Sequence, residues 1–96
     1  MVVIERTPRL AEVRGPESGL LTATNDYRAL PPGPLAAGPL GESSCARYTR
    51  VMELTSAAGR VDGPGALSIL NDPGVRLPIT VQQMVMSASG GTLELG

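Results

Sequence analysis

Residues 43–59 read Ser-Ser-Cys-Ala-Arg-Tyr-Thr-Arg-Val-Met-Glu-Leu-Thr-Ser-Ala-Ala-Gly, and this stretch decides the fold because it belongs to the longest run without Pro or interior Gly. Ser43 or Ser44 is a favourable N-cap, and Gly59 supplies a stop. The sequence therefore predicts a helix over Cys45–Ala58. Four residues spaced i, i+3, i+4 and i+7 give this helix one mostly apolar stripe: Tyr48, Val51, Met52 and Thr55.

The segments on both sides of this helix favour short strands and loops. Residues 31–41 form a loop rich in Pro and Gly, which disfavours helix and strand alike. Before the loop, residues 2–5 and 10–14 predict a hairpin or two successive strands, and 20–24 a third strand. After the helix, the pattern predicts a second helix, a strand, and a final strand paired with it as a hairpin: Gly65–Leu70, Thr80–Ser87 and Thr92–Leu95.

This order of elements predicts the α+β class, as one antiparallel sheet with two helices on one face. The 96 residues allow a single, partial domain, 1–96. Leu20, Leu21, Val81 and Met84–Met86 look apolar on both faces of the sheet. A partner is therefore expected to cover the face that the helices leave open.

The composition excludes several chemistries. The chain has no His, no Lys and one Cys, so it lacks the parts for a Ser-His couple, a Schiff base, a Walker loop or a typical zinc site. We expect no cofactor and no metal. A net charge of −1 with scattered Arg residues argues against nucleic acid as a partner. The apolar runs are too short to cross a membrane, and the single Cys together with the lack of a signal-like start favours a cytoplasmic location.

Cys45 is the single soft nucleophile of the chain. It falls in the first turn of the predicted helix, where the helix dipole lowers the pKa of a thiol. The competing interpretation, a small packed side chain, is favoured because no His is present to serve as base.

Two segments carry an order of residues more specific than the composition. Thr24-Asn25-Asp26-Tyr27 ends a predicted strand, and Ser43-Ser44-Cys45-Ala46-Arg47-Tyr48 opens the helix. The amide of Asn25 is suited to donate to a developing oxyanion, and Arg47 is suited to orient a carbonyl or carboxylate. Taken singly, each also has a structural interpretation, as a turn residue and as a surface ion-pair partner.

Together and in this order, the two segments resemble motifs of the N-terminal-nucleophile hydrolases of the C45 peptidase type. These enzymes are relatives of acyl-coenzyme A:6-aminopenicillanic acid acyltransferase and, more distantly, of choloylglycine hydrolases. In that family a Thr-Asn-His-Tyr-like motif ends a strand, and a helix opens with a Ser-Ser-x-x-Arg-Tyr-like motif. The resemblance spans nearly the whole chain, although Asp26 stands where many relatives have His.

The resemblance implies that the chain is the C-terminal portion of a four-layer αββα sandwich, acting on acyl amides or acyl-coenzyme A. Asn25 would match the oxyanion Asn, Arg47 the Arg that borders the nucleophile, and Ser44 would support Arg47. An N-terminal Cys whose own α-amine is the base would perform the attack, and Cys45 does not match it. We therefore expect a fragment that is inactive alone and needs a complementary upstream chain.

An alternative of another class is a noncatalytic self-associating or binding module. In this hypothesis, the open sheet face or the strand edges pair with a second copy of the chain.

Overall fold

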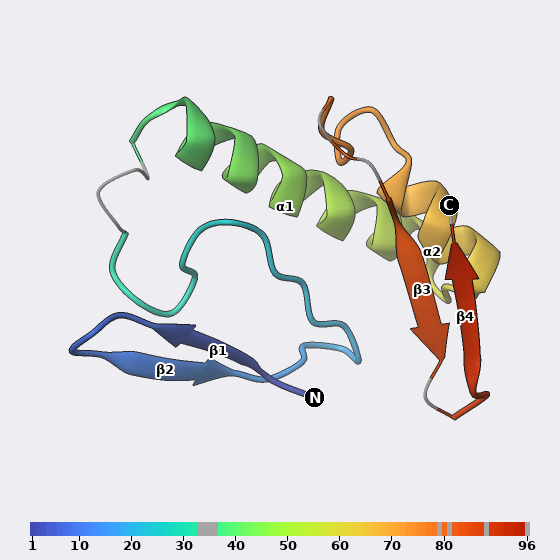
Figure 1. The fold of residues 1–96 in the computed structure, drawn as a ribbon, viewed down its shortest axis with the longest axis horizontal. Helices are drawn as coiled ribbons and strands as arrows, with labels where there is room; N and C mark the ends of the chain where they lie inside the picture. The colour runs from blue at the N-terminus through green and yellow to red at the C-terminus, as the bar shows by residue number, and fades with distance from the viewer. Residues whose placement is uncertain (33–36, 79, 81, 88, 96) are drawn as a thin grey trace. The chain divides into compact units, whose positions relative to one another are not determined.

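The computed structural model describes residues 1–32, 37–78, 80, 82–87 and 89–95. It confirms the α+β class, with six elements shown in Figure 1. In chain order these are β1 (Val3–Arg6), β2 (Ala11–Arg14), α1 (Pro39–Ala58), α2 (Gly63–Leu70), β3 (Met84–Ser87) and β4 (Thr92–Leu95). The chain divides into two compact units, residues 1–48 and 49–96.

In the first unit, β1 and β2 form the predicted antiparallel hairpin. Ile4 lies opposite Val13 and Glu5 opposite Glu12. Because side chains alternate across a strand, Ile4 and Val13 share one face while Glu5 lies on the other. Ile4 and Val13 are exposed, whereas Glu5 is buried. The hairpin thus presents its apolar face outward and buries a carboxylate.

The predicted third strand over residues 20–24 is wrong. Among the described residues, this region contributes a single isolated bridge between Glu17 and Leu20, closed by a turn in which Ser18 and Gly19 both have positive φ, 50° and 76°. The backbone that follows bonds to side chains instead of to a neighbouring strand. Arg14 Nη2, for example, donates to the carbonyl oxygen of Thr22 at 3.0 Å, so this carbonyl has a side-chain partner.

Helix α1 confirms the predicted helix but begins earlier, at Pro39 instead of near Ser43 or Ser44. Proline suits the first helical turn because the nitrogen of that position needs no partner. The last three residues of the predicted 31–41 loop are therefore helical, and residues 33–36 lie outside the described part. Gly59 follows the helix with a φ of 71° and donates to the carbonyl of Thr55, as a C-terminal stop should. All four residues of the predicted stripe are half-buried.

In the second unit, α2 confirms the predicted helix and starts two residues before Gly65. Asp62 is its N-cap, and its Oδ1 accepts from Gly65 N at 2.7 Å. The helix packs against β3. A guanidinium of α1 anchors the segment that follows α2: Arg50 Nε and Nη2 each lie 3.0 Å from a carboxylate oxygen of Asp72.

Strands β3 and β4 form the predicted C-terminal hairpin, with Met84 opposite Leu95 and Met86 opposite Leu93. The first strand is shorter than predicted. Gln82 and Gln83 are not in a strand, and Ile79 and Val81 lie outside the described residues. Gln83 Nε2 instead donates to the carbonyl of Leu70 at 2.6 Å, which ties the approach to β3 to the end of α2.

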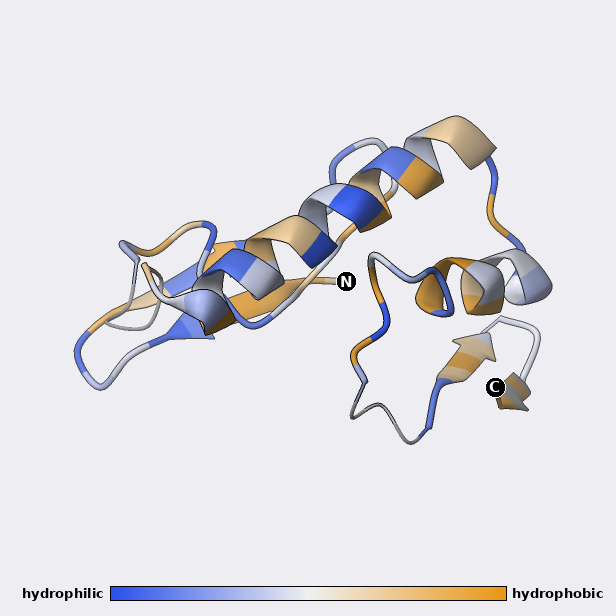
Figure 2. Ribbon diagram, turned by 90° about the horizontal axis from the view of Figure 1, so that it is seen from above, coloured by the Kyte–Doolittle hydropathy of each residue, from blue (hydrophilic) through white to orange (hydrophobic). Residues whose placement is uncertain are grey.

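The prediction of one sheet under two helices is wrong, because the described residues form two separate two-stranded sheets, β1–β2 and β3–β4. The third strand that would have extended the first hairpin is absent from residues 20–24. Large apolar residues of the strands stay exposed, among them Ile4, Val13, Met86 and Leu93. Figure 2 colours the apolar residues of the ribbon orange. In the described part, Leu30 is the one buried apolar residue. Polar contacts therefore carry much of the order in the first unit.

Candidate functional site

The structure brings the two motif segments together within the first unit. Asn25 and Asp26 lie on the irregular segment, residues 21–32, that follows the Glu17–Leu20 turn. Ser44 and Arg47 lie on α1. Two side-chain pairs join the segments: Arg47 with Asn25, and Ser44 with Asp26. The C45-type resemblance singled out both Asn25 and Arg47, but it did not predict this hydrogen bond between them.

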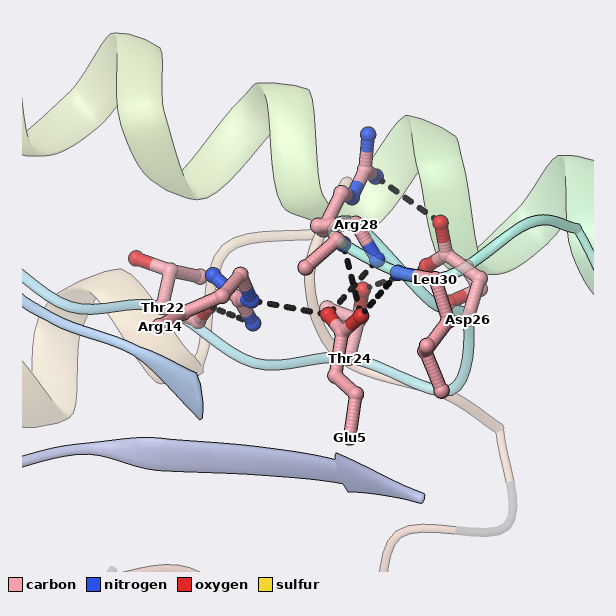
Figure 3. A network of polar contacts seen from close by, with 9 residues as sticks. Glu5, Arg14, Thr22, Thr24, Asp26, Arg28 and Leu30 are labelled. Atoms are coloured by element: carbon pink, nitrogen blue, oxygen red, sulfur yellow. Dashed lines mark hydrogen bonds and ion pairs between the residues drawn. The ribbon is translucent and has the colours of Figure 1, made fainter. Parts of the chain in front are cut away.

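A buried carboxylate holds the end of the irregular segment in place. Glu5 points from β1 toward residues 28–30, as Figure 3 shows. Its oxygens accept from the backbone N–H groups of Arg28 and Ala29 at 2.6 Å and of Leu30 at 2.9 Å. Arg14 Nε adds an ion pair at 2.8 Å. Sequence reasoning missed Glu5, because its backbone partners lie more than twenty residues away in the chain.

The contacts of Glu5 determine its acidity. Burial raises the pKa of this carboxyl. The N–H groups of Leu30, Arg28 and Ala29 and the Arg14 guanidinium lower it by more, so the pKa falls from 4.5 to about 2. Hydrogen bonds to the charged form of a carboxylate have this effect. Glu5 is therefore an anion at neutral pH, and its role in the unit is to hold backbone rather than to exchange protons.

The carboxylate of Asp26 is bound by three neighbouring side chains. Its Oδ1 accepts from Thr24 Oγ1 at 2.9 Å and from Ser44 Oγ, and its Oδ2 lies 3.2 Å from Arg28 Nη2. Burial raises the pKa of Asp26, yet the hydrogen bonds from Ser44 and Thr24 and the charge of Arg28 hold it below its usual value. These donors balance the negative charge of Asp26 beside Asn25.

Arg47 fixes the carboxamide of Asn25. Arg47 Nη2 donates to Asn25 Oδ1 at 2.9 Å, and Arg47 Nε donates to Ser43 Oγ at 3.4 Å. A guanidinium carries donors only, so the amide oxygen must face it. The NH₂ group of Asn25 consequently lies on the other branch of the carboxamide. Because Asn25 is exposed, that group is available to an acceptor from outside.

Ser44 is fully buried and donates to Asp26. The hydroxyl in contact with Arg47 is that of Ser43, so the support predicted from Ser44 comes from its neighbour. Ser44 instead joins α1 to the irregular segment. Arg28 strengthens the same junction by lying over the ring of Tyr48, 3.8 Å from the ring centroid.

Cys45 is exposed, which corrects the preference for a packed thiol. Because α1 begins at Pro39, Cys45 also lies beyond the first helical turn. The influence of the helix dipole falls off within that turn, and Cys45 therefore loses the activation that the predicted helix start would have given it.

Comparison with family models, with curated proteins and with solved structures finds no match to this chain. Across the described residues, no three His, Cys, Asp or Glu side chains gather as a metal ion would need. Nor is either helix in that part of the chain both long and apolar enough to cross a membrane. The geometry of Asn25 and Arg47 therefore carries the functional argument.

Proposed function

We propose that this chain supplies the oxyanion-binding and orienting groups of an N-terminal-nucleophile hydrolase or acyltransferase that acts on acyl amides or acyl-coenzyme A. In this proposal the chain is the C-terminal portion of an αββα sandwich. The nucleophile, an N-terminal Cys, comes from a complementary segment outside the 96 residues.

The observation that carries this proposal is the 2.9 Å contact between Arg47 Nη2 and Asn25 Oδ1. This contact holds the Asn25 carboxamide by its oxygen and leaves the NH₂ group to donate to another acceptor. Oxyanion stabilisation requires a donor that is oriented before the reaction, because reorientation during the reaction would cost part of the gain. A second support is that Ser44, Thr24 and Arg28 balance the charge of Asp26, which would otherwise oppose a developing anion next to Asn25.

The chemistry assigns each group one role. The α-amine of the N-terminal Cys accepts the thiol proton, and the sulfur attacks the acyl carbonyl carbon. The carbonyl π electrons move to oxygen, and Asn25 Nδ2 donates to the resulting O⁻. Collapse of this intermediate expels the amine or coenzyme A thiol with a proton, and water or an acceptor amine then releases the acyl group. Arg47 keeps Asn25 oriented throughout.

Coexpression tests the proposal. The chain is produced together with the segment encoded directly upstream, and hydrolysis of acyl p-nitroanilides and acyl-coenzyme A is measured. We expect activity that Asn25→Ala lowers by roughly 10²–10³-fold in kcat, as for the loss of other oxyanion donors. Asn71→Ala is the matched control, since Asn71 is exposed at the end of α2. Activity that Asn25→Ala leaves unchanged would refute the oxyanion role.

A second candidate function is self-association without catalysis, and the exposed face of the C-terminal hairpin favours it. Four apolar side chains share this face and remain 46–72% exposed: Met84, Met86, Leu93 and Leu95. Apolar faces of sheets are normally covered. Sedimentation that depends on protein concentration would support this candidate, and a monomer at every concentration would oppose it.

A further inference from the structure

Arg47 differs from the other arginines of the chain in being held in place without a carboxylate. Three arginines pair with acids: Arg14 with Glu5, Arg28 with Asp26, and Arg50 with Glu53 and Asp72. The remaining four, Arg6, Arg9, Arg60 and Arg76, are exposed. Arg47 is half-buried, and among the described residues its recorded partners, Asn25 Oδ1 and Ser43 Oγ, are neutral. Its guanidinium is thus held in position, and no ion pair within the described part of the chain compensates its charge.

The donors that remain at this point belong to two adjacent side chains. Within the described part of the chain, neither Arg47 Nη1 nor Asn25 Nδ2 donates to a protein acceptor. Both groups are donors only, so each calls for an oxygen that carries lone pairs. The acid nearest in sequence, Asp26, accepts from Ser44 and Thr24 and pairs with Arg28.

We propose that Arg47 and Asn25 bind a carboxylate, the anionic group of the acid that amide or thioester hydrolysis releases. One carboxylate oxygen accepts from Arg47 and the other from Asn25 Nδ2. Planar guanidinium and carboxamide groups suit the two coplanar lone-pair directions of a carboxylate, and the charge of Arg47 strengthens the contact. The inference rests on the proposed function in using the same two side chains, but it requires binding by the chain alone and no reaction.

Nuclear magnetic resonance on the ¹⁵N-labelled chain tests this proposal. Sodium acetate is titrated at constant ionic strength against sodium chloride, and the Asn25 side-chain NH₂ and Arg47 Nε–H resonances are followed. We expect both to shift and to saturate at roughly millimolar acetate, the range typical of a small ligand with two polar contacts. Acetamide, which has the planar shape of acetate but no charge, should shift them at least several-fold less at equal concentration. No saturable shift, or an equal response to acetamide, overturns the carboxylate assignment.

Substitutions locate the site. Arg47→Gln removes the charge, and we expect at least a tenfold loss of acetate affinity, while Arg47→Lys keeps the charge but loses the planar fork and should still weaken binding. Arg76→Gln, at an exposed arginine, is the matched control and should bind acetate as the wild type does. If Arg47→Gln does not fold, Arg47→Lys is compared with the wild type instead. Undiminished acetate binding by Arg47→Lys would refute the role of the planar guanidinium.

The result is separable from the test of catalysis. Acetate binding by the chain together with an inactive coexpressed complex would leave the carboxylate site standing and remove the proposed reaction. Activity that depends on Asn25, with no acetate binding by the chain, would support the proposed reaction and remove the carboxylate site.

Discussion

At the scale of single residues, the first unit is held by carboxylates rather than by apolar packing. Glu5 is 5% exposed and joins β1 to the backbone of residues 28–30, while Asp26 joins the irregular segment to α1. Every buried side-chain polar atom in the described residues has a partner. A satisfied network of this kind rigidifies a structure, and the loss of one member leaves buried donors unpaired.

Glu5→Gln should destabilise the chain by about 1–3 kcal/mol at pH 7. The substitution removes the charge and turns an NH₂ group toward N–H donors that need an acceptor. Urea unfolding followed by circular dichroism measures the change. Glu12→Gln is the matched control, because Glu12 lies opposite Glu5 in the same hairpin but is exposed. Equal stability of the two variants would contradict a structural role for Glu5.

Stability should also fall with acid through Glu5. The pKa of Glu5 in the folded chain, about 2, lies below its ordinary value of 4.5. A carboxyl with a depressed pKa contributes stability that is fully present above the ordinary value and is lost as the pH falls toward the folded value. We therefore expect the free energy of unfolding to decrease from about pH 4.5 to about pH 2, with a smaller slope in Glu5→Gln. Identical slopes in variant and wild type would count against this assignment.

Ser44→Ala should cost about 1 kcal/mol of stability, because Asp26 loses a buried donor. The pKa of Asp26 should rise toward its ordinary value, since the hydrogen bond from Ser44 helps to lower it. A carboxyl titration by nuclear magnetic resonance checks the pKa, and urea unfolding checks the stability. Ser56→Ala, at an exposed serine of the same helix, should change neither quantity.

At the scale of elements, Gly59 tests why α1 ends where it does. Its φ of 71° lies in the left-handed region, which costs a residue with a Cβ about 1–2 kcal/mol. Gly59→Ala should therefore destabilise the chain by that amount in thermal or urea unfolding. The positions are comparable in space, because a Cβ meets nothing within 4 Å at Gly59 or at Gly15. Gly15→Ala, where φ is not positive, should be neutral or slightly stabilising.

The elements that sequence predicted well are those fixed by local signals. Both helices depend on periodicity, an N-cap or proline, and a terminal stop, and each hairpin depends on a short turn between two short strands. The segment 20–24 was mistaken for a strand because its apolar pattern is local, whereas Arg14, which binds the carbonyl of Thr22, acts from another element. The prediction of a single sheet was wrong for the same reason, because it included a strand over residues 20–24.

Some residues of the candidate site could likewise be predicted from the sequence, and others could not. The resemblance pointed to Asn25 and Arg47, and the structure places them in contact, but their catalytic role stays a prediction. Glu5 escaped notice because a single acid in a short strand usually faces solvent. Its importance depends on three backbone N–H groups more than twenty residues away, which no local pattern encodes.

At the scale of the whole molecule, each unit leaves an apolar sheet face uncovered. Ile4 and Val13 are 64% and 61% exposed on the first hairpin. On the second hairpin, β3 contributes two Met and β4 two Leu to the exposed face. A two-fold axis parallel to these strands would place the Met column of one copy on the Leu column of the other. The face is thus self-complementary and uncharged, as a symmetric dimer requires.

The size of this face predicts weak association. Covering the exposed parts of its four side chains would contribute roughly 4–7 kcal/mol per copy. Two copies therefore gain roughly 7–14 kcal/mol, which is comparable with the roughly 4–15 kcal/mol that association costs in lost freedom. We expect a dimer only at high micromolar concentrations or above, and a monomer in dilute solution.

Met86→Glu tests this association, since Met86, at 72%, is the most exposed of the four side chains of this face. A two-fold axis would bury two added charges, so dimerisation should weaken by more than tenfold while the folded monomer is unaffected. Sedimentation velocity over a range of concentrations measures both properties. Leu40→Glu is the control, because Leu40 is 67% exposed in the first turn of α1, outside both sheet faces. If the wild type stays monomeric at millimolar concentration, or if both variants associate alike, the β3–β4 face is not the contact and self-association through it is refuted.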